Sequence, residues 1–525
     1  MPNILPFKTE ITQKLSLSVL SGIMLAISYP GLNLYYFEWI AFVPLILAIQ
    51  NTNLRTCYIL ATITGFFGVV IGFHWFGNWA EIALEIPFPL SYIATLGYSF
   101  AVAQVFGIIF TVFQVIKNKF PKIDILVLPI VFVAIFSAAP IIFKFSLGDA
   151  QSYFLIAVQA IEFTGVYGLD SIIILTNIII YKLIFDRQNI PNRFLLTGAL
   201  LIIVIWFGVG LIRLNNWDKK IARWDKKRIG LVQPNRKATL KHVKSKHPYS
   251  RTFPKEIALS QKLLSDYPDV IIWPEGQNFG YSTLVKVQDA FRSQISRMQV
   301  PLVFHDITWV LKNNQKGFYN STLWLDKDGQ FSDQYNKIIR VPFGEYTPFT
   351  ENIPFIKDIL GNFLINLSKG DERKAFPIAG MKLVPVICYE SLFPAFVAES
   401  IQGSPAGKVI VIQSQDGWYG KSSASEQHLT SSVLRAIENR VPLIHVINNG
   451  RSAIALPNGK YVFVSTFFKE GQWVVEMPFR KASGGSFYSK FPYLYIYCIR
   501  FCFALIIFGY WLNSRKSKRI INKKV

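Results

Sequence analysis

Pro385-Val386-Ile387-Cys388-Tyr389-Glu390 is the stretch around which the chain is organised, and Ser391-Leu392-Phe393 follow it. The apolar run Leu383 to Ile387 is typical of a buried β-strand, which would deliver one thiol to a turn. If the next residues begin a helix, the partial positive charge of its N-terminus favours a thiolate on Cys388. The pattern predicts a nucleophilic cysteine, although an ordinary buried cysteine fits the same residues.

The composition predicts a membrane protein. The chain has 525 residues, of which 51% are hydrophobic and only 17% are charged, which is too apolar for a wholly soluble protein of this size. Its formal net charge of +23 comes from basic residues that are dispersed or lie beside apolar runs. This distribution favours membrane orientation over nucleic-acid binding, so we expect no nucleic-acid partner.

The cysteines offer no disulfide framework. Three of the four, Cys57, Cys498 and Cys502, lie in or beside apolar runs, and Cys388 is alone in the polar portion of the chain. The sequence therefore allows an oxidising compartment but does not require one.

Seven apolar runs precede the polar portion, and each is a candidate for crossing a bilayer, which takes about 20 residues with some tolerance. Their approximate limits are Leu15 to Tyr29, Leu34 to Ile49, Tyr58 to Phe76, Ser91 to Ile116, Ile125 to Phe143, Val166 to Phe185 and Phe194 to Ile212. An eighth run, Phe491 to Leu512, comes before a basic tail. We therefore predict a membrane domain of seven transmembrane helices (1–213), a polar domain (228–480), an eighth transmembrane helix (491–512) and a basic tail (513–525).

Basic residues in the short loops predict the orientation. They gather in alternate loops, at Lys8 and Lys14, Arg55, Lys117, Lys119 and Lys122, and Lys182, Arg187 and Arg193, and in the tail from Arg515. The opposite loops carry Glu81 and Glu85 and little besides Lys144. The positive-inside rule places the N-terminus and the tail in the cytoplasm, so the polar domain lies outside. The first run has no evident cleavage site and is expected to stay as an anchor.

Most of the predicted spans lack ionisable side chains in their middles. The exceptions are His74, near an outer interface, Asp170, and Arg500, which lies well inside the last run. An ion-coupled transporter needs charged groups along its path, so this distribution counts against one.

The polar domain alternates between strand and helix patterns. Strands are expected at Arg228–Gln233, Asp269–Trp273, Leu302–Asp306, Tyr319–Leu325, Phe331–Ile338, Leu383–Ile387, Val409–Gln413, Leu443–Ile447 and Ala453–Leu456, with helices at Pro254–Tyr267, Lys286–Met298, from about Leu392 and at Ser425–Arg440. Such alternation predicts a layered α/β domain.

Three polar residues sit at the ends of predicted strands: Glu275, Lys337 and Cys388. Active-site residues collect where the strands of one sheet end at the same edge. A carboxylate can take a thiol proton, an ammonium can stabilise charge on a carbonyl oxygen, and a thiolate can attack an acyl carbon. Taken singly, Glu275 also fits a solvated loop carboxylate and Lys337 a surface charge.

Their contexts together resemble the nitrilase superfamily, whose Glu, Lys and Cys occur in this order within an α-β-β-α sandwich. A nitrilase-like domain between seven membrane helices and an eighth is similar to the apolipoprotein N-acyltransferase family. Matching pieces are Glu38–Leu45, Gly165–Gly168, Trp273-Pro274-Glu275, Tyr335-Asn336-Lys337, Val341–Tyr346 and Cys388-Tyr389-Glu390. The implied fold is a polytopic α-helical membrane domain plus this α/β sandwich.

The resemblance implies a role for each matching residue. It makes Glu275 the general base, Lys337 the oxyanion stabiliser and Cys388 the acylated nucleophile, without a metal or cofactor. Glu345 matches a second glutamate that could orient Lys337. Tyr389 and Glu390 also match residues important in the family, and for Glu390 an anchoring role through hydrogen bonds is an equal alternative.

The resemblance also implies the reaction. An acyl chain passes from a phospholipid donor to Cys388 as a thioester, and then to the α-amino group of a diacylglyceryl-modified N-terminal cysteine on an apolipoprotein acceptor. The expected protein is a monomer in the bacterial inner membrane, in contact with membrane lipids, with its catalytic domain facing the periplasm. The alternatives are a membrane-anchored nitrilase-type amidohydrolase and a transport or sensor protein with an idle nitrilase-like domain.

Some segments bear on how the substrate would be held. Where the family carries a tryptophan after its Gln-x-Asn segment, this chain has Leu240-Lys241-His242 after Gln233-Pro234-Asn235. Gln415 stands where an asparagine is usual, and Asn448-Asn449-Gly450-Arg451 is unusually basic at its end. Pro354–Ile356, Ile359-Leu360 and Phe363–Ile365 could form lipid-facing arms or ordinary helix core.

Overall fold

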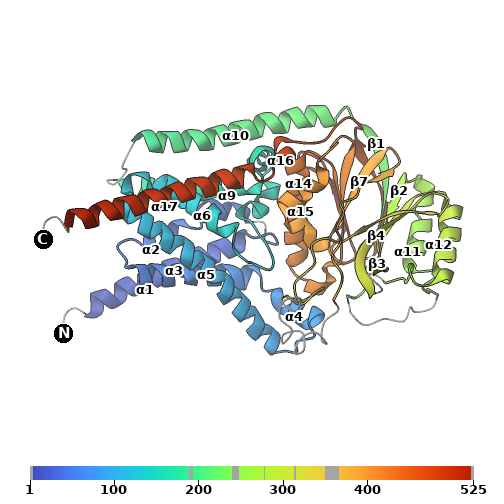
Figure 1. Cartoon of the computed structure of the whole chain (residues 1–525), viewed down its shortest axis with the longest axis horizontal. Helices are drawn as coiled ribbons and strands as arrows, with labels where there is room; N and C mark the ends of the chain where they lie inside the picture. The colour runs from blue at the N-terminus through green and yellow to red at the C-terminus, as the bar shows by residue number, and fades with distance from the viewer. Residues whose placement is uncertain are drawn as a thin grey trace. The chain divides into compact units, whose positions relative to one another are not determined.

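The computed structural model describes residues 4–32, 34–187, 193–238, 248–276, 278–312, 315–348 and 366–521. The chain divides into two compact units (Figure 1). Unit 1 comprises Met1–His74, Tyr92–Arg213 and Phe491–Val525, and unit 2 comprises Trp75–Ser91 and Leu214–Lys490. The three expected apolar arms and Leu240-Lys241-His242 lie outside the described residues.

Long apolar helices form the framework of unit 1. Among the described residues, six helices are long and apolar enough to cross a membrane, as a multi-pass membrane protein requires. They lie within α1 (Ile4–Ser28), α3 (Leu54–Gly72), α5 (Leu90–Lys119), α9 (Val166–Phe185), α10 (Arg193–Ile221) and α17 (Leu494–Ile521). In both α10 and α17 few of the apolar side chains are buried, as in lipid-facing helices.

Two of the predicted spans fold as shorter pieces. Leu34 to Ile49 forms η1 (Tyr35–Trp39) and α2 (Val43–Ala48), and Ile125 to Phe143 contributes α6 (Asp124–Phe136). Other short helices of unit 1 are η2 (Pro121–Ile123), η3 (Leu147–Tyr153), α7 (Leu155–Val158) and α8 (Ile161–Thr164). How often the chain crosses the bilayer therefore stays a prediction.

Glycines allow α1 and α3 to pack closely. A Cβ atom at Gly22 would lie 2.6 Å from the carbonyl oxygen of Thr64, and one at Gly68 would lie 2.9 Å from a methyl of Leu25. Small residues at such contacts let two membrane helices approach each other and gain dispersion energy.

The ionisable residues singled out from the sequence have polar neighbours in unit 1. Asp170 accepts hydrogen bonds from the Ser146 hydroxyl at 2.9 Å and the Gly148 amide at 2.8 Å. His74 is exposed, as an interfacial side chain would be, and Nδ1 of its ring lies 3.0 Å from the Ile71 carbonyl. Arg500 donates to Ser137 at 3.4 Å. None of these contacts requires a transport path.

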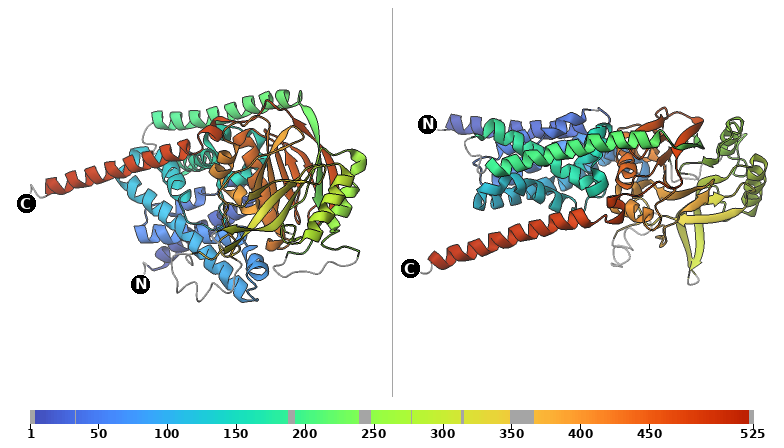
Figure 2. Two further views of the ribbon diagram at one scale, coloured as in Figure 1. Left: turned by 45° about the vertical axis from the view of Figure 1, so that its right-hand side comes forward. Right: turned by 90° about the horizontal axis from the view of Figure 1, so that it is seen from above.

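Unit 2 is an α-β-β-α sandwich of two six-stranded sheets (Figures 1 and 2). The first has the order β12-β1-β2-β3-β4-β5 and the second β11-β10-β9-β8-β7-β6. The strands are β1 (Asp225–Gln233), β2 (Val270–Ile272), β3 (Leu302–Lys312), β4 (Gln315–Leu325), β5 (Phe331–Asn336), β6 (Phe376–Ile378), β7 (Met381–Ile387), β8 (Lys408–Ser414), β9 (Leu443–Ile447), β10 (Ala453–Ala455), β11 (Tyr461–Val464) and β12 (Gly471–Phe479). At the centre of each sheet three strands run parallel, β1-β2-β3 and β7-β8-β9, and the remaining pairs are antiparallel.

Helices cover the outer face of each sheet. The first sheet packs on α11 (Lys255–Gln261) and α12 (Val285–Met298), in a core that includes Trp273 and Phe291. The second packs on α14 (Pro394–Ile401) and α15 (Ala424–Asn439), through residues such as Val397 and Ile412. Every residue of β8 is buried because both faces of its sheet are covered. Two further short helices of this unit are η5 (Leu264–Asp266) and α16 (Phe487–Lys490).

A short helix from the first part of the chain belongs to unit 2. α4 (Phe76–Ala83) follows α3 in sequence but contacts η7 (Asp416–Tyr419), and Trp75 just before it contacts α15. The Trp75 indole donates to the Gln427 side chain at 3.0 Å, and the Asn78 amide donates to the Tyr419 carbonyl at 3.1 Å. The sequence did not predict that this segment joins the sandwich.

Candidate active site

The ends of three strands bring the predicted site residues together. Glu275 follows β2, Lys337 follows β5 and Cys388 follows β7, and all three side chains are buried. Nζ of Lys337 lies 3.9 Å from Oε1 of Glu275, and the charges of both act on the thiol. The three residues therefore lie at strand ends as expected, but on two sheets rather than one: β2 and β5 belong to the first sheet and β7 belongs to the second.

Glu345 holds the lysine in place. Its Oε1 lies 2.8 Å from Nζ of Lys337, and its Oε2 accepts a hydrogen bond of 2.8 Å from the Val341 amide. Burial alone would lower the pKa of Lys337, but the carboxylates of Glu345 and Glu275 outweigh it and raise that pKa. Lys337 therefore stays protonated and can donate to a developing oxyanion.

Asn320, in the middle of β4, links the two glutamates. Its Nδ2 donates to Oε1 of Glu275 at 2.7 Å and to Oε1 of Glu345 at 2.8 Å. Its Oδ1 lies 2.8 Å from Nε2 of His305, which donates to it, since Nδ1 of the same ring accepts from the Gly276 amide at 3.4 Å. The His305 contact thus fixes which end of the Asn320 amide faces the carboxylates.

The second oxygen of Glu275 is different. Oε2 is buried and has no hydrogen-bond partner among the described residues. A buried carboxylate oxygen normally has a partner, so one that lacks it is ready to accept a proton. On the Glu275 carboxylate, Oε1 thus accepts a hydrogen bond from Asn320, whereas Oε2 has no hydrogen-bond partner among the described residues.

Cys388 sits on a sharp turn. It begins η6 (Cys388–Leu392) and has a φ of 50°, in the left-handed region that residues with a Cβ rarely adopt. Glu390 anchors this turn: its carboxylate accepts from the amides of Ile387 at 2.8 Å and Ile338 at 2.7 Å, and from the Tyr335 hydroxyl at 2.8 Å. These contacts use both carboxylate oxygens, as the anchoring interpretation of Glu390 requires.

The expectation that a helix N-terminus favours a thiolate is wrong for the resting site. η6 is a single short turn, and burial together with the negative charge of Glu275 raises the pKa of the Cys388 thiol. The Lys337 ammonium offsets only part of this effect. The thiol is therefore protonated at rest and needs a base before it can attack. Tyr389 is buried beside it, with its ring 5.1 Å from that of Phe393.

Two known protein families match ranges of this chain that together include parts of both units. The carbon-nitrogen hydrolase family matches residues 231–482, and the apolipoprotein N-acyltransferase N-terminal domain matches residues 21–179. An apolipoprotein N-acyltransferase of Geobacter metallireducens is 25% identical over 495 residues, which cover 90% of this chain and 91% of that protein. One of Rickettsia typhi is 31% identical over 318 residues, 60% of this chain and 62% of that protein.

The chain belongs to the apolipoprotein N-acyltransferase family. Among solved structures, an amidase of the nitrilase superfamily from Nesterenkonia AN1 is 16% identical, with a TM-score of 0.35 over 49% of this chain and 92% of its own.

In this family member one of the sequence departures, Gln415, lies beside the site. The Gln415 side chain lies against Gly276, where an added Cβ would be 2.6 Å from its Nε2, and it accepts from Asn448 at 2.7 Å. Gln415 therefore fills the space beside the backbone that carries Glu275. Arg451 pairs with Glu426 at 3.0 Å, so its charge is directed to a surface carboxylate.

Several polar residues in and around the candidate site were missed from the sequence. Asn320 lies in a strand interior, where alternation alone does not single it out. Asp416 and His428 lie on separate elements and meet only in the fold. For Asn320 the sequence held one weak signal, because a buried polar residue in a strand needs a hydrogen-bond partner.

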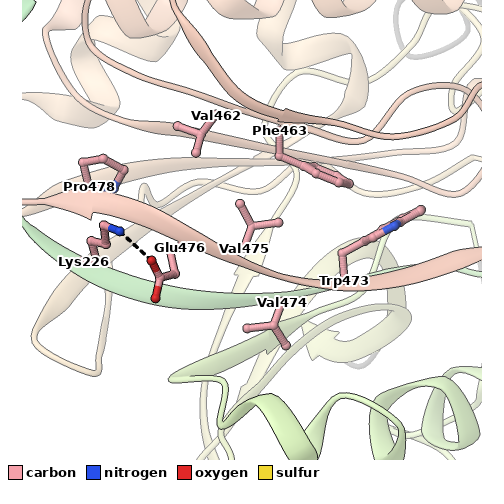
Figure 3. A pocket seen from close by; sticks show the side chains of 8 residues that line it. All are labelled: Lys226, Val462, Phe463, Trp473, Val474, Val475, Glu476 and Pro478. Atoms are coloured by element: carbon pink, nitrogen blue, oxygen red, sulfur yellow. Dashed lines mark hydrogen bonds and ion pairs between the residues drawn. The ribbon is translucent and has the colours of Figure 1, made fainter.

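A pocket of 460 Å³ lies elsewhere on unit 2 of the N-acyltransferase family member (Figure 3). It is lined by residues of β1, β11 and β12: Lys226, Val462, Phe463, Trp473, Val474, Val475, Glu476 and Pro478. Lys226 and Glu476 pair at its rim, 2.6 Å apart. None of the six predicted site residues lines it.

Proposed function

We propose that the protein transfers an acyl chain from a phospholipid to the α-amino group of an N-terminal diacylglyceryl-cysteine on apolipoproteins. One observation carries the proposal. A buried Glu275, Lys337 and Cys388 occur in a carbon-nitrogen hydrolase unit, within a chain whose other unit matches the N-terminal domain of apolipoprotein N-acyltransferases. An amidohydrolase needs only the first of these two parts.

In the first half-reaction, Oε2 of Glu275 takes the thiol proton as the sulfur of Cys388 attacks the ester carbon of the phospholipid. Negative charge develops on the ester oxygen, and the Lys337 ammonium donates a hydrogen bond to it. The C–O bond then breaks, and the lysophospholipid oxygen leaves with the proton from Glu275. The enzyme keeps the acyl chain as a thioester.

In the second half-reaction, the α-amino group of the acceptor attacks the thioester carbon. Glu275 removes a proton from the nitrogen as the C–N bond forms, and Lys337 again stabilises the oxyanion. The C–S bond breaks, and the proton on Glu275 returns to the sulfur. One base and one oxyanion donor thus serve both steps, so the site needs no further group to turn over.

The membrane unit suits these substrates. Moving an acyl chain from lipid into water costs about 0.8 kcal/mol for each methylene group, so a site reached from the bilayer avoids most of that cost. The exposed apolar faces of α10 and α17 support contact with lipid. We place unit 2 on the periplasmic side of the bacterial inner membrane, which the loop charges support.

Trapping the acyl-enzyme tests the proposal. Purified protein is incubated with phosphatidylethanolamine in detergent micelles, and the intact mass and the peptide that contains Cys388 are measured. We expect an added fatty acyl group on Cys388, released by hydroxylamine and absent in Cys388→Ala. Adding a diacylated lipopeptide should discharge it to an N-acylated product. A wild-type protein that forms no acyl-Cys388 contradicts the proposal.

A further inference from the structure

Three buried polar side chains lie behind Cys388 and take part in no step above. Ser391 lies on η6, Asp416 on η7 and His428 on α15. Oγ of Ser391 lies 2.9 Å from Nε2 of His428, and Nδ1 of the same ring lies 2.9 Å from Oδ1 of Asp416. The spacing resembles a serine hydrolase triad, so the positions of the protons decide what it does.

The Ser391 hydroxyl donates its proton elsewhere. Oγ donates to the carbonyl oxygen of Cys388 at 2.9 Å, so it can only accept from Nε2 of His428. Nδ1 faces a carboxylate that accepts only, so it donates as well. Both ring nitrogens of His428 carry protons, which leaves no base for activating Ser391. The three residues therefore do not form a second nucleophilic centre.

The chain of donors ends on a strained residue. It runs from the His428 imidazolium through Ser391 to the carbonyl of Cys388, whose φ is 50°. A residue with a Cβ in this region is held there by its surroundings at an energetic cost. Glu390 accepts a hydrogen bond from the Ile387 amide, on the N-terminal side of the turn. Ser391 donates to the carbonyl of Cys388 itself. The two contacts together fix the turn that aims the thiol.

We propose that Ser391, His428 and Asp416 form a positioning relay that holds the Cys388 turn in its reactive conformation and works only while His428 is protonated. The proposal rests on the proposed function for its substrate, but not for its geometry. Asp416 supplies the counter-charge, and the Ser414 hydroxyl donates to the same Oδ1 at 2.8 Å, which keeps that carboxylate in place.

The charged surroundings of His428 give the relay a pH limit. The groups that face it are Asp416 on η7, His445 on β9 with its ring centroid 5.0 Å away, Glu275 after β2, and the Cys388 carbonyl. Burial would lower the pKa of His428, but Asp416 outweighs it and raises that pKa. Burial and the His428 charge lower the pKa of His445 to about 3, so His445 stays neutral. The relay is intact below the raised pKa of His428 and is lost as the pH rises through it.

The test uses the full-length protein with Cys57, Cys498 and Cys502 replaced by Ala, so that Cys388 is the only thiol. Ser391→Ala removes the donor to the carbonyl, Ser391→Thr keeps a hydroxyl, and His428→Gln offers a donor that does not titrate. Ser400→Ala is the matched control, because this buried hydroxyl bonds the Phe396 carbonyl in α14. Two rates are measured against pH: alkylation of Cys388 by iodoacetamide, and acyl loading from phosphatidylethanolamine micelles.

We expect Ser391→Ala to slow both rates on the order of tenfold, because a misaligned nucleophile reacts slowly. Ser391→Thr should restore most of the loss, and Ser400→Ala should match the parent. In His428→Gln, acyl loading should lack the alkaline fall that the parent shows. Parent-like rates in Ser391→Ala, no rescue by Thr, or an unchanged alkaline fall in His428→Gln would overturn the relay. If the parent is alkylated but never acylated, the proposed function fails while alkylation still decides the relay.

Discussion

Glu275 keeps its two carboxylate oxygens in different surroundings, and this difference makes its role testable. Glu275→Gln preserves the size of the side chain and an oxygen for the Asn320 donor, but it cannot take a proton. Loss of a positioned base lowers rates by about 10²–10⁴-fold, so we expect acyl loading to fall by that much. Single-turnover formation of acyl-Cys388, followed by mass spectrometry, gives the rate.

Glu476→Gln is the matched control, because this carboxylate is exposed and pairs with Lys226. Its loading rate should equal that of the wild type, and both variants should unfold at the wild-type temperature. Loading by Glu275→Gln within a factor of about three of the wild type would assign the base to another group.

Asn320 is a second residue whose role can be tested by substitution. One variant removes its hydrogen bonds to Glu275 and Glu345, and another adds a negative charge in its place. Asn320→Leu removes both donors, so the buried carboxylate of Glu275 and the half-buried one of Glu345 each lose a hydrogen bond, at a cost of about 1–3 kcal/mol in folding free energy. Acyl loading should fall with it. Denaturant unfolding in detergent and the single-turnover assay provide the two measurements.

Asn320→Asp should make acyl loading depend on pH in the same sense as the relay does, with the lower rate at the higher pH. It places a third carboxylate between two others, so the introduced group has a raised pKa and repels both glutamates once ionised. As the pH falls the introduced carboxyl binds a proton and can donate again. Loading relative to the wild type at the same pH should therefore rise as the pH is lowered, and a ratio that does not change with pH would contradict this assignment.

The sequence could predict Glu275, Lys337 and Cys388 because each lies at the end of a strand and carries a group with obvious chemistry. It could not predict the partners that make them work. Asn320 looks like any polar residue in an amphipathic strand, and His428 like one polar residue on a helix. The state of the Cys388 thiol was mispredicted for the same reason, since burial beside Glu275 depends on the tertiary fold.

At the scale of elements, long buried strands were the easiest to predict. β7, β8 and β9 are continuous apolar runs because helices cover one face of their sheet and the other sheet covers the second. β11 and β12 lie at sheet edges, where half-exposed residues dilute the pattern, and they were not predicted. In unit 1, burial inside the helix bundle lets α6 be short, which hydropathy alone does not reveal.

The α1 and α3 contact gives a prediction for an element. Gly22→Val would force side-chain atoms against the Thr64 carbonyl and Phe67, so the helices must separate. Overpacking of this kind costs about 1–3 kcal/mol, and we expect a lower unfolding temperature in detergent. Gly198→Ala on α10 is the control, because no atom lies within 4 Å of an added Cβ there. An unchanged unfolding temperature in Gly22→Val would mean that the helices do not pack so closely.

At the scale of the whole molecule, the orientation can be read with membrane-impermeant thiol reagents on intact inner-membrane vesicles and spheroplasts. After Cys57, Cys498 and Cys502 are replaced, Lys327→Cys in the exposed β4–β5 turn should be labelled from the periplasmic side. Arg515→Cys should be labelled only from the cytoplasmic side. Labelling of both positions from the same side would overturn the predicted topology.

Transfer and hydrolysis differ in how long the thioester lasts. A transferase must hold acyl-Cys388 until the second lipid arrives, so water has to be kept from a bond that it can attack. Without acceptor, we expect acyl-Cys388 to persist over many turnover times and little fatty acid to appear. Release of fatty acid at the same rate with and without the diacylated lipopeptide would instead indicate a hydrolase.

The position of α4 has a consequence for how the protein is made. The sandwich is discontinuous in sequence, since Trp75–Ser91 pack with Leu214–Lys490. On the ribosome, the helix that contacts η7 is synthesised before most of the membrane helices and must wait for the strands to follow. A fragment cut at Leu214 to obtain a soluble catalytic unit would lack the partners of Gln427 and the Tyr419 carbonyl. The Trp75–Ser91 segment should therefore be present when such a fragment folds, either fused to it or added as a separate peptide.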